Sequence, residues 1–557
     1  MNAPCTVYVE DLRLKFPGES QLTFKDVSFA AKKGEKVLLL GPSGCGKSTL
    51  LQVLSGMIPN AIEVPMKCAG QQIPSSWAYV FQDPDTQFCM PYVDEELAFV
   101  LENLSVPQED MLARMKEVLG KVGLQLDDLH MPISHLSQGM KQRLALASAL
   151  LLQPDVLFLD EPSALLDPEG REQIWEAVKS VSDGRTLIIV EHRIEEMVEY
   201  VDRVVLFGPS GLILGEGRPE YMFTAYQQEL KDYGIWYPGV WDDYIRSEAG
   251  ADSKAKAKAK TDHISATMGH GELASDVVPY DSLSENKDLG RIGMDTITRS
   301  GALHPVMDLH DITVLRKKEA VVQLERGVVY PEEFIAVTGP NGAGKSSLLL
   351  GLIGLLPLEG EYYLSGEVVV LGKKRKERKF REQMLRRIGF VFQNPELQFV
   401  TERVLDEVAY SLLVDGMPLA QAEQAARESL DRFGLKGLEH RHPYQLSTGQ
   451  KRRLSVATAM ARQPEVLLLD EPTFGQDARN TFAILDMCEE LRQAGTAIIM
   501  VTHEMKIAQH AATQVWDVRE GRVVPHQVSS SMTTGFPGSS RRESRDEQEL
   551  SLTGVSR

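Results

Sequence analysis

Two glycine-rich loops, one in each half of the chain, constrain the fold more than any other feature. The first reads Gly-Pro-Ser-Gly-Cys-Gly-Lys-Ser over residues 41–48, and the second reads Gly-Pro-Asn-Gly-Ala-Gly-Lys-Ser over residues 339–346. At this spacing the glycines let backbone N–H groups converge on phosphate oxygens, and the helix that follows directs its positive end at the same charge. Each loop follows a short apolar run, at 37–40 or 334–337, which predicts a buried strand. The sequence therefore indicates two phosphate-binding domains in tandem.

Four further motifs follow each loop in the same order. From the Gln to the His the second copy trails the first by 310 or 311 residues, whereas the loop lysines are 298 residues apart. The second copy thus carries about a dozen extra residues around 361–387. An isolated loop of this kind arises by chance often, but two loops with ordered followers do not. The followers are Gln82, Leu136–Gly139, Asp160, Glu161 and His192 in the first copy, and Gln393, Leu446–Gly449, Asp470, Glu471 and His503 in the second.

Apolar runs alternate with helical segments in both halves, which indicates an α/β fold with a mainly parallel sheet covered on both faces. The sequence from about Ser247 to Ser300 consists of Lys-Ala repeats, Ser, Gly and Asp without an apolar period, and the sequence after Val528 is rich in Ser, Arg and Glu. These compositions predict a flexible linker at 246–303 and a disordered tail at 527–557. One domain is then expected at 1–245 and another at 304–526.

The repeated residues suit phosphoryl transfer, which depends mainly on positioning and charge stabilisation. The loop lysines would reach the β- and γ-phosphates of ATP, and the loop serines would ligate Mg²⁺. Each strand-end Asp would hold that ion through water, the following Glu would polarise the attacking water, and the His would contact the γ-phosphate. The expected catalytic residues are Glu161, His192, Glu471, His503, Gln82 and Gln393, and the expected Mg²⁺ ligands are Ser48, Gln82, Asp160, Ser346, Gln393 and Asp470.

In this order the motifs resemble those of ATP-binding-cassette (ABC) ATPases, and the resemblance covers all but the linker and tail. It implies two tandem P-loop NTPase cassettes, each with a mainly parallel sheet, a small antiparallel β subdomain and a helical signature subdomain. In that family the Ser and Gly of the signature Leu-Ser-x-Gly cap the γ-phosphate held by the opposite cassette. The nucleotide-binding residues so implied are Phe16, Gly41, Pro42, Ser43, Gly44, Cys45, Gly46, Lys47, Ser48, Thr49, Ser137 and Gly139, with Gly339, Pro340, Asn341, Gly342, Ala343, Gly344, Lys345, Ser346, Ser347, Ser447, Gly449 and Gln450 from the second copy.

Two positions depart from the family pattern. Met140 replaces the usual Gln after the first signature, which is expected to weaken the site that it completes. Phe16 stands where the family places an aromatic ring against adenine, but the second copy has Arg316 there. A guanidinium can lie over a base, and an ordinary surface Arg is the alternative. Since neither change removes a catalytic group, both sites are expected to be competent but unequal.

The sequences around the two glutamines, at 81–99 and 392–410, resemble the ATPase subunits of energy-coupling-factor (ECF) importers, which take up vitamins, vitamin precursors and transition-metal ions. Residues 473–477 resemble the D-loop of fused, two-cassette members. The resemblance implies a transmembrane scaffold subunit that docks through arginines, and a separate substrate-binding membrane subunit. Arg–carboxylate pairs are directional enough to transmit a push, although a solvated helix start would also be acidic. The implied docking residues are Asp94, Glu95, Glu96, Asp406 and Glu407.

Charge separates this hypothesis from its rivals. Asp and Glu number 79 against 60 Lys and Arg, a net charge of −19, which disfavours nucleic acid as a partner. A soluble twin-cassette ATPase acting on ribosomes or DNA therefore ranks lower. The fused ATPase of a sugar importer usually has one degenerate site, and two intact Glu–His pairs argue against it. No apolar run reaches the ~18–20 residues that cross a bilayer, so we expect a peripheral protein on the cytoplasmic face of the cell membrane.

Two further segments have unusual compositions, one aromatic and one basic. Eight aromatic residues crowd residues 221–244 and predict that a C-terminal helix packs onto the first cassette. The basic segment at 373–381 is expected to be a solvated arm, with lipid headgroups or RNA as alternatives.

Overall fold

The computed structural model describes residues 5–17, 22–164, 166–246, 304–369 and 386–528. Nearly all of the predicted linker, the basic segment at 373–381 and nearly all of the predicted tail lie outside these residues, while Arg246, the first predicted linker residue, ends α9. The chain divides into two compact units, each described by itself below. The first combines Met1–Gly250 with Gln393–Thr458 and Glu471–Cys488, and the second combines Ala251–Phe392, Ala459–Asp470 and Glu489–Arg557. The units therefore cut across the predicted second cassette.

A mainly parallel sheet in the first unit runs in the order β10-β9-β3-β8-β7-β6. All its pairs are parallel except β9 with β10. Its inner strands are continuous apolar runs, as expected where helices cover both faces; α1 packs against β7 and β8, and α5 against β6. The elements are β3 (Lys36–Leu40), α1 (Lys47–Leu54), α2 (Met57–Asn60), β6 (Trp77–Val80), β7 (Val156–Asp160), α6 (Pro168–Val181), β8 (Thr186–Val190), β9 (Arg203–Phe207), β10 (Ile213–Gly217), α7 (Pro219–Ala225), α8 (Gln227–Tyr233) and α9 (Val240–Arg246).

A smaller antiparallel sheet in the same unit pairs β1 (Cys5–Leu14) with β2 (Phe24–Lys32), and β4 (Met66–Lys67) and β5 (Gly70–Gln72) also pair with β1. Side chains from this sheet share one apolar core with α1 and the parallel sheet, through residues such as Val9, Leu39 and Phe158. Among the described strands, no backbone pairing joins the two sheets of the first unit.

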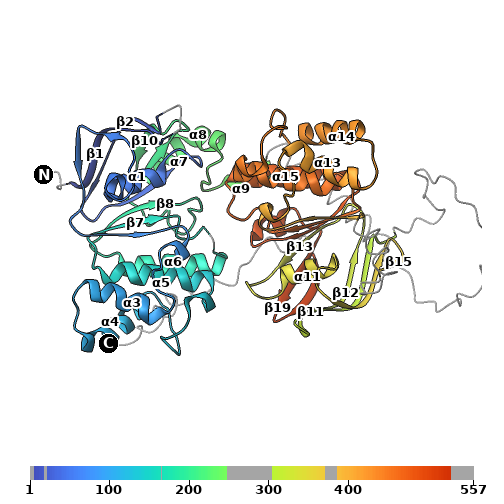
Figure 1. Cartoon of the computed structure of the whole chain (residues 1–557), viewed down its shortest axis with the longest axis horizontal. Coiled ribbons are helices and arrows are strands. Elements are labelled where there is room, and N and C mark those ends of the chain that lie inside the picture. The colour runs from blue at the N-terminus through green and yellow to red at the C-terminus, as the bar shows by residue number, and fades with distance from the viewer. Residues whose placement is uncertain (1–4, 18–21, 165, 247–303, 370–385, 529–557) are drawn as a thin grey trace, which may run out of the picture. The chain divides into compact units, whose positions relative to one another are not determined.

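Helices from both copies belong to the first unit. From the first copy come α3 (Val93–Asn103), α4 (Gln108–Lys121) and α5 (Gln138–Leu151), which contact one another and which Figure 1 shows side by side. The second copy contributes α13 (Val404–Val414), α14 (Leu419–Arg432), most of α15 (Thr448–Met460) and the start of α16 (Ala478–Gln493). None of the helices in the described part of the chain is long and apolar enough to cross a membrane.

In the second unit, the described strands form one sheet in the order β15-β14-β11-β12-β20-β19-β13-β18-β17-β16. Its antiparallel and parallel parts join where β12 and β20 pair through Gln323↔Arg522 and Leu324↔Val523. The elements are β11 (Met307–Arg316), β12 (Glu319–Val329), β13 (Phe334–Thr338), α11 (Lys345–Leu352), β14 (Leu358–Leu364), β15 (Glu367–Val368), β16 (Ile388–Val391), β17 (Val466–Asp470), β18 (Ala497–Val501), α17 (Met505–His510), β19 (Gln514–Arg519) and β20 (Arg522–Gln527).

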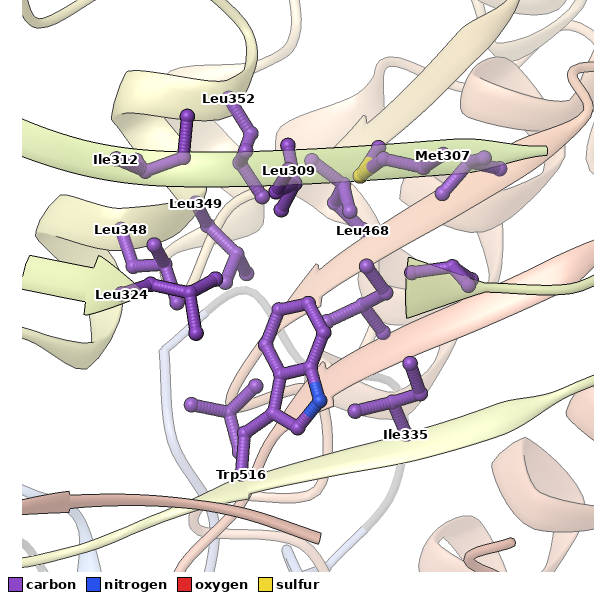
Figure 2. Close-up of a cluster of buried hydrophobic side chains, with 14 of the residues drawn as sticks. Met307, Leu309, Ile312, Leu324, Ile335, Leu348, Leu349, Leu352, Leu468 and Trp516 are labelled. Carbon is purple, nitrogen blue, oxygen red and sulfur yellow. The ribbon is translucent and has the colours of Figure 1, made fainter. Parts of the chain in front are cut away.

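Trp516 lies at the centre of the core of the second unit. Its side chain is fully buried among residues that include Ile335 and Leu468 (Figure 2), and its indole N–H donates to the Gln514 side chain. The core covers the parallel strands and α11 together, so it holds the second phosphate loop in place between β13 and α11. The predicted α/β fold with mainly parallel sheets is confirmed.

Candidate functional site

The first phosphate loop connects β3 to α1. Gly46 caps α1 with φ 101°, and a Cβ there would lie 2.8 Å from the Phe24 ring, so this position requires glycine. Lys47 is buried and its Nζ donates to the carbonyls of Gly41 (2.8 Å) and Pro42 (3.0 Å). In the second unit, Lys345 Nζ donates to the corresponding Gly339 and Pro340 carbonyls, both at 2.8 Å. Each loop therefore closes around its ammonium group, where phosphate charge would be neutralised.

The strand-end aspartates lie beside the loop serines. Ser48 Oγ donates to Asp160 at 2.7 Å, and Tyr79 OH donates to its other oxygen at 2.8 Å. Burial raises the pKa of Asp160, and these two hydrogen bonds oppose the rise. Ser346 Oγ donates to Asp470 at 2.9 Å in the second unit. A hydroxyl beside a carboxylate suits Mg²⁺, whose remaining ligands in such sites are water and phosphate oxygens. This explains why the described residues hold no cluster of three His, Cys, Asp or Glu side chains around a metal position.

Glu161 lies directly after β7 at the centre of the first site. His192 Nε2 is 2.9 Å from one carboxylate oxygen, and Gln82 Nε2 donates to the other at 2.9 Å. Burial raises the pKa of Glu161, but the hydrogen bond and charge of His192 outweigh it and leave the pKa below its ordinary value. The group is thus held as a carboxylate, the form that accepts a proton. In the first unit the second copy repeats part of this arrangement, because Gln393 Nε2 donates to Glu471 at 2.9 Å.

A cavity of about 750 Å³ contains the first loop, a size typical of sites for small ligands. Phe16 lines it together with the loop, Glu161 and His192, so the predicted adenine-stacking residue lies in the same cavity as the catalytic candidates. Sequence reasoning missed Leu22, Thr23 and the turn Pro209–Gly211, which also line it. The glycine-rich turn Gly-Pro-Ser-Gly at 208–211, directly after β9, was the available signal.

The two signatures start their helices differently. Ser137 accepts a hydrogen bond from Met140 N at 3.3 Å at the start of α5. In the second copy, Ser447 Oγ accepts from Gln450 N at 3.4 Å, and Gln450 Oε1 accepts from Ser447 N at 3.0 Å. This reciprocal capping box satisfies two helix-start N–H groups, and a Met side chain cannot supply the second bond. The substitution at Met140 therefore removes a cap and leaves the Ser137 cap in place.

Two predicted docking residues have a different role. Glu96 is 2% exposed and accepts from the backbone N–H groups of Cys89 (2.8 Å) and Met90 (2.9 Å). Glu407 is 1% exposed and accepts from Val400 N (3.0 Å) and Thr401 N (2.8 Å). Because these carboxylates are buried and already bonded, they do not fit the prediction that they receive a partner's arginine. They anchor the loops that follow Gln82 and Gln393.

The other three acidic candidates are more accessible. Asp94 lies 3.1 Å from His130 Nδ1, Glu95 is exposed, and Asp406 accepts from Arg403 at 2.6 and 2.8 Å. Lysines from the signature helices hold the same loops: Lys141 donates to Asp85 at 2.7 Å, and Lys451 to Glu396 at 2.6 Å. The loop after each Gln is thus bonded to the helix that begins at its own signature.

A further buried carboxyl group lies next to the first site. Glu191, directly before His192, accepts from Ser163 Oγ at 2.9 Å and from His192 N at 3.1 Å. Burial and the nearby charge of Glu161 raise the pKa of Glu191 to about 7. The second copy has Thr502 at this position. An acidic residue between an apolar strand and the His was visible in the sequence, but its burial was not.

Replacing Glu191 with Gln should stabilise the protein more as pH rises. The folded pKa exceeds the ordinary value of 4.5, so the folded state retains a proton that the unfolded chain releases. The stabilisation that this retained proton gives to the folded state is fully present below pH 4.5 and is lost as pH rises through about 7. The free energy of unfolding contributed by Glu191 thereby falls by about 3 kcal/mol. The melting temperature of Glu191→Gln minus that of the parent should therefore increase from pH 5.5 to pH 8. The exposed Glu172→Gln is the control, and a difference that stays flat for Glu191→Gln would contradict the prediction.

Comparisons with known proteins agree with this geometry. A family model described as ABC transporter matches residues 24–164 and 326–474. YkoD of Bacillus subtilis (strain 168), whose name assigns it provisionally to HMP/thiamine import as an ATP-binding protein, is 35% identical over 91% of this chain and 88% of its own length. A provisionally named ABC transporter ATP-binding protein of Methanosarcina acetivorans is 31% identical over 93% of this chain and 85% of its own.

One solved structure matches most of the chain. It is that of the archaeal ribosome recycling factor aABCE1, in complex with the archaeal ribosomal stalk protein aP1. The match has a TM-score of 0.56 and covers 94% of this chain and 91% of that one, at 17% identity. At this identity the likeness shows the fold alone.

Proposed function

Because this chain belongs to the ABC transporter family and carries its ATP-binding cassette twice, we propose that it is the energy-coupling ATPase of an ECF-type importer for a vitamin, a vitamin precursor or a transition-metal ion. The observation that carries the catalytic part is the carboxylate of Glu161 held between Gln82 and His192 beside the phosphate loop. The name of YkoD supports a thiamine-related vitamin precursor as the first solute to test. ATP hydrolysis coupled to transport is the activity of the family.

The residues of the first site divide the reaction among themselves. Lys47 and the N–H groups of its loop bind the phosphates and neutralise their charge. The Glu161 carboxylate, ionised and 2.9 Å from His192 Nε2, orients the attacking water and accepts its proton. His192 and Gln82 hold that carboxylate from its two oxygens, and His192 lines the cavity beside the loop. Ser48 and Asp160 would hold Mg²⁺, which supplies charge neutralisation at the β- and γ-phosphate oxygens.

Exposed apolar side chains support a protein partner. Around the loop and helix that follow Gln393, Leu397 is 71% exposed, Val400 67% and Val414 59%. Several exposed apolar side chains in one stretch of 18 residues favour an interaction site. Asp406, in the first turn of α13, adds a carboxylate to the same stretch of sequence. We therefore infer that a helix of a transmembrane scaffold, with apolar residues and at least one arginine, docks here. A peripheral position on the cytoplasmic face of the membrane follows from that inference.

Reconstitution tests the proposal. The full chain is purified with the membrane proteins that bind it, and the complex is placed in vesicles with ATP enclosed in the lumen, the side toward which an importer moves its solute. Uptake of labelled thiamine precursors, other vitamins and Ni²⁺ or Co²⁺ is then measured. We expect ATP-dependent uptake of one solute. Recovery of the chain with ribosomes and never with membranes would overturn the importer assignment.

Charge reversal tests the docking surface. Asp94→Lys, Glu95→Lys and Asp406→Lys together should lower the recovery of the membrane complex at least tenfold, because each would repel an arginine. Nucleotide binding by the purified chain should persist, since these side chains lie outside the described cavity. A control with Glu109→Lys, Asp110→Lys and Glu117→Lys on α4 matches the charge change. Undiminished complex formation by the first variant would exclude docking through these carboxylates.

A further inference from the structure

The aromatic segment at the end of the first copy has an unexpected partner. The segment is predicted to pack a C-terminal helix onto the first cassette, and α7 does contact β9 and β10 there. Within the first compact unit, however, Ile235, Trp236 and Trp241 are buried, and the segment packs against residues 476–486, which follow Glu471 in the second copy. The packing therefore links residues that lie some 240 positions apart in the chain.

Two backbone groups of the second copy bond to this segment. Trp236 Nε1 donates to the Gln476 carbonyl at 3.2 Å, and Ala478 N donates to the Gly234 carbonyl at 3.0 Å. Gly234 has φ 70°, and a Cβ there would lie 2.3 Å from Arg479 Cβ. Only glycine permits that approach. The bonds fix the turn 476–478 at the start of α16.

An aromatic cluster anchors the same contact. Tyr244 stacks on Phe482 with ring centroids 4.2 Å apart, and Tyr244 OH donates to Asp486 at 2.8 Å. Trp241 meets Phe482 edge-on at 5.1 Å. Offset stacks and edge contacts are the favourable arrangements of aromatic rings. The cluster holds Trp236 in one orientation, because Trp236 also contacts Trp241 and Phe482.

Trp236 also contacts Arg193, the residue next to His192 of the candidate site. The guanidinium carbon of Arg193 lies 3.6 Å from the centre of the indole ring, within cation–π range. Arg193 directly follows His192, whose Nε2 is 2.9 Å from Glu161. Asp477 is close enough to His192 for that charge to act on it: burial raises the pKa of Asp477, and His192 partly lowers it. In the second copy Glu504 follows His503, and a carboxylate cannot replace a cation over a ring.

We propose that Trp236 and Arg193 are positioning residues for ATP hydrolysis at the site of Lys47. Together they couple the position of the turn 476–478 to the position of His192. Trp236 contacts the turn through its indole N–H and contacts Arg193 through the face of its ring. A shift of the turn would therefore move Trp236 and Arg193, and with them the loop that contains His192. The link is one-sided, because Glu504 breaks the pattern in the second copy. The inference rests on ATP hydrolysis by this chain, as proposed above, but not on any membrane partner.

The experiment compares Trp236→Phe, Arg193→Met and the double variant in the full-length protein. Phe keeps an aromatic ring and removes the N–H that reaches Gln476, whereas Met removes the charge and keeps the length of the side chain. We expect each single variant to lower kcat for ATP about five- to tenfold with KM within twofold. The double variant should be no worse than the poorer single variant, because both act through one link. Arg193→Lys should restore part of the loss.

Controls separate positioning from folding. Tyr221→Phe changes a residue of the same aromatic stretch that is 60% exposed, and its kcat should match the parent. If Trp236→Phe has a lower melting temperature than the parent, the kcat values of Arg193→Met and Arg193→Lys still test the positioning role. Unchanged kcat in Arg193→Met, or losses that multiply in the double variant, would overturn the inference. A parent chain that fails to hydrolyse ATP would instead overturn the proposed function.

Discussion

Replacing both Glu161 and Glu471 with Gln is expected to lower steady-state ATP hydrolysis by roughly 10²–10⁴-fold, the usual contribution of a general base. Gln keeps the size of each side chain and can still bond to Gln82 or Gln393, but it cannot take a proton from water. ATP binding should persist, since the phosphate loops are unchanged. The variant should therefore retain ATP through gel filtration, where the parent retains ADP.

The single variants resolve the two sites. Glu161→Gln leaves the site of Lys345 intact, and Glu471→Gln leaves the site of Lys47 intact, so their residual rates compare the two directly. Turnover is measured by phosphate release under saturating ATP, with the exposed Glu172→Gln as a control. Hydrolysis by the double variant at the parental rate would rule out the general-base role of both residues.

Removing the side chain of Glu96 should give the largest loss of stability among the substitutions considered. Glu96→Ala leaves the N–H groups of Cys89 and Met90 without their acceptor in a buried place. An orphaned donor costs about 1–3 kcal/mol, so the pair should cost about 2–5 kcal/mol. We expect the first thermal transition to fall by about 5–10 °C.

Two companions make that measurement specific. Glu102→Ala removes an exposed carboxylate from the same helix, α3, and should change the transition by less than about 1–2 °C. Glu96→Gln keeps an acceptor oxygen and should fall between the two. If Glu96→Ala has the same transition temperature as Glu102→Ala, the hydrogen bonds that Glu96 accepts contribute nothing measurable to stability. A loop that loosens without unfolding would appear instead as raised hydrogen exchange at Cys89 and Met90.

Local pattern predicted much of the fold and of the first site. Apolar runs that end in a glycine-rich loop, an Asp–Glu pair or a His specify strands of a parallel sheet together with what lies at their ends. Ser48 and Asp160, 112 residues apart in sequence, do meet, as do Gln82 and Glu161. Spacing could predict these meetings because neighbouring parallel strands carry their termini to one edge of the sheet.

What the sequence did not predict depends on burial and on distant contacts. Asp94, Glu95 and Glu96 are consecutive acidic residues that the sequence alone does not distinguish. Of these three residues of α3, only Glu96 has a buried side chain, and it accepts two backbone N–H bonds there. Glu191 was overlooked because its partner Ser163 lies 28 residues away. The aromatic stretch contacts the first copy through α7, as predicted, but its contact with the second copy was not predicted, since no local pattern encodes a contact between Trp236 and Gln476.

The pairing of β12 with β20 gives the second compact unit a different expected path of unfolding from the first. In the second unit a backbone ladder runs through the antiparallel and parallel strands alike, so breaking one part exposes hydrogen-bonding groups of the other, and the sheet opens as a single cooperative block. In the first unit, among the described strands, only side chains join the corresponding layers. There we expect the small sheet that contains β1 and β2 to open as a separate foldon, which would move Phe16 away from the described cavity while β7, with Asp160, and β8, which precedes His192, stay intact.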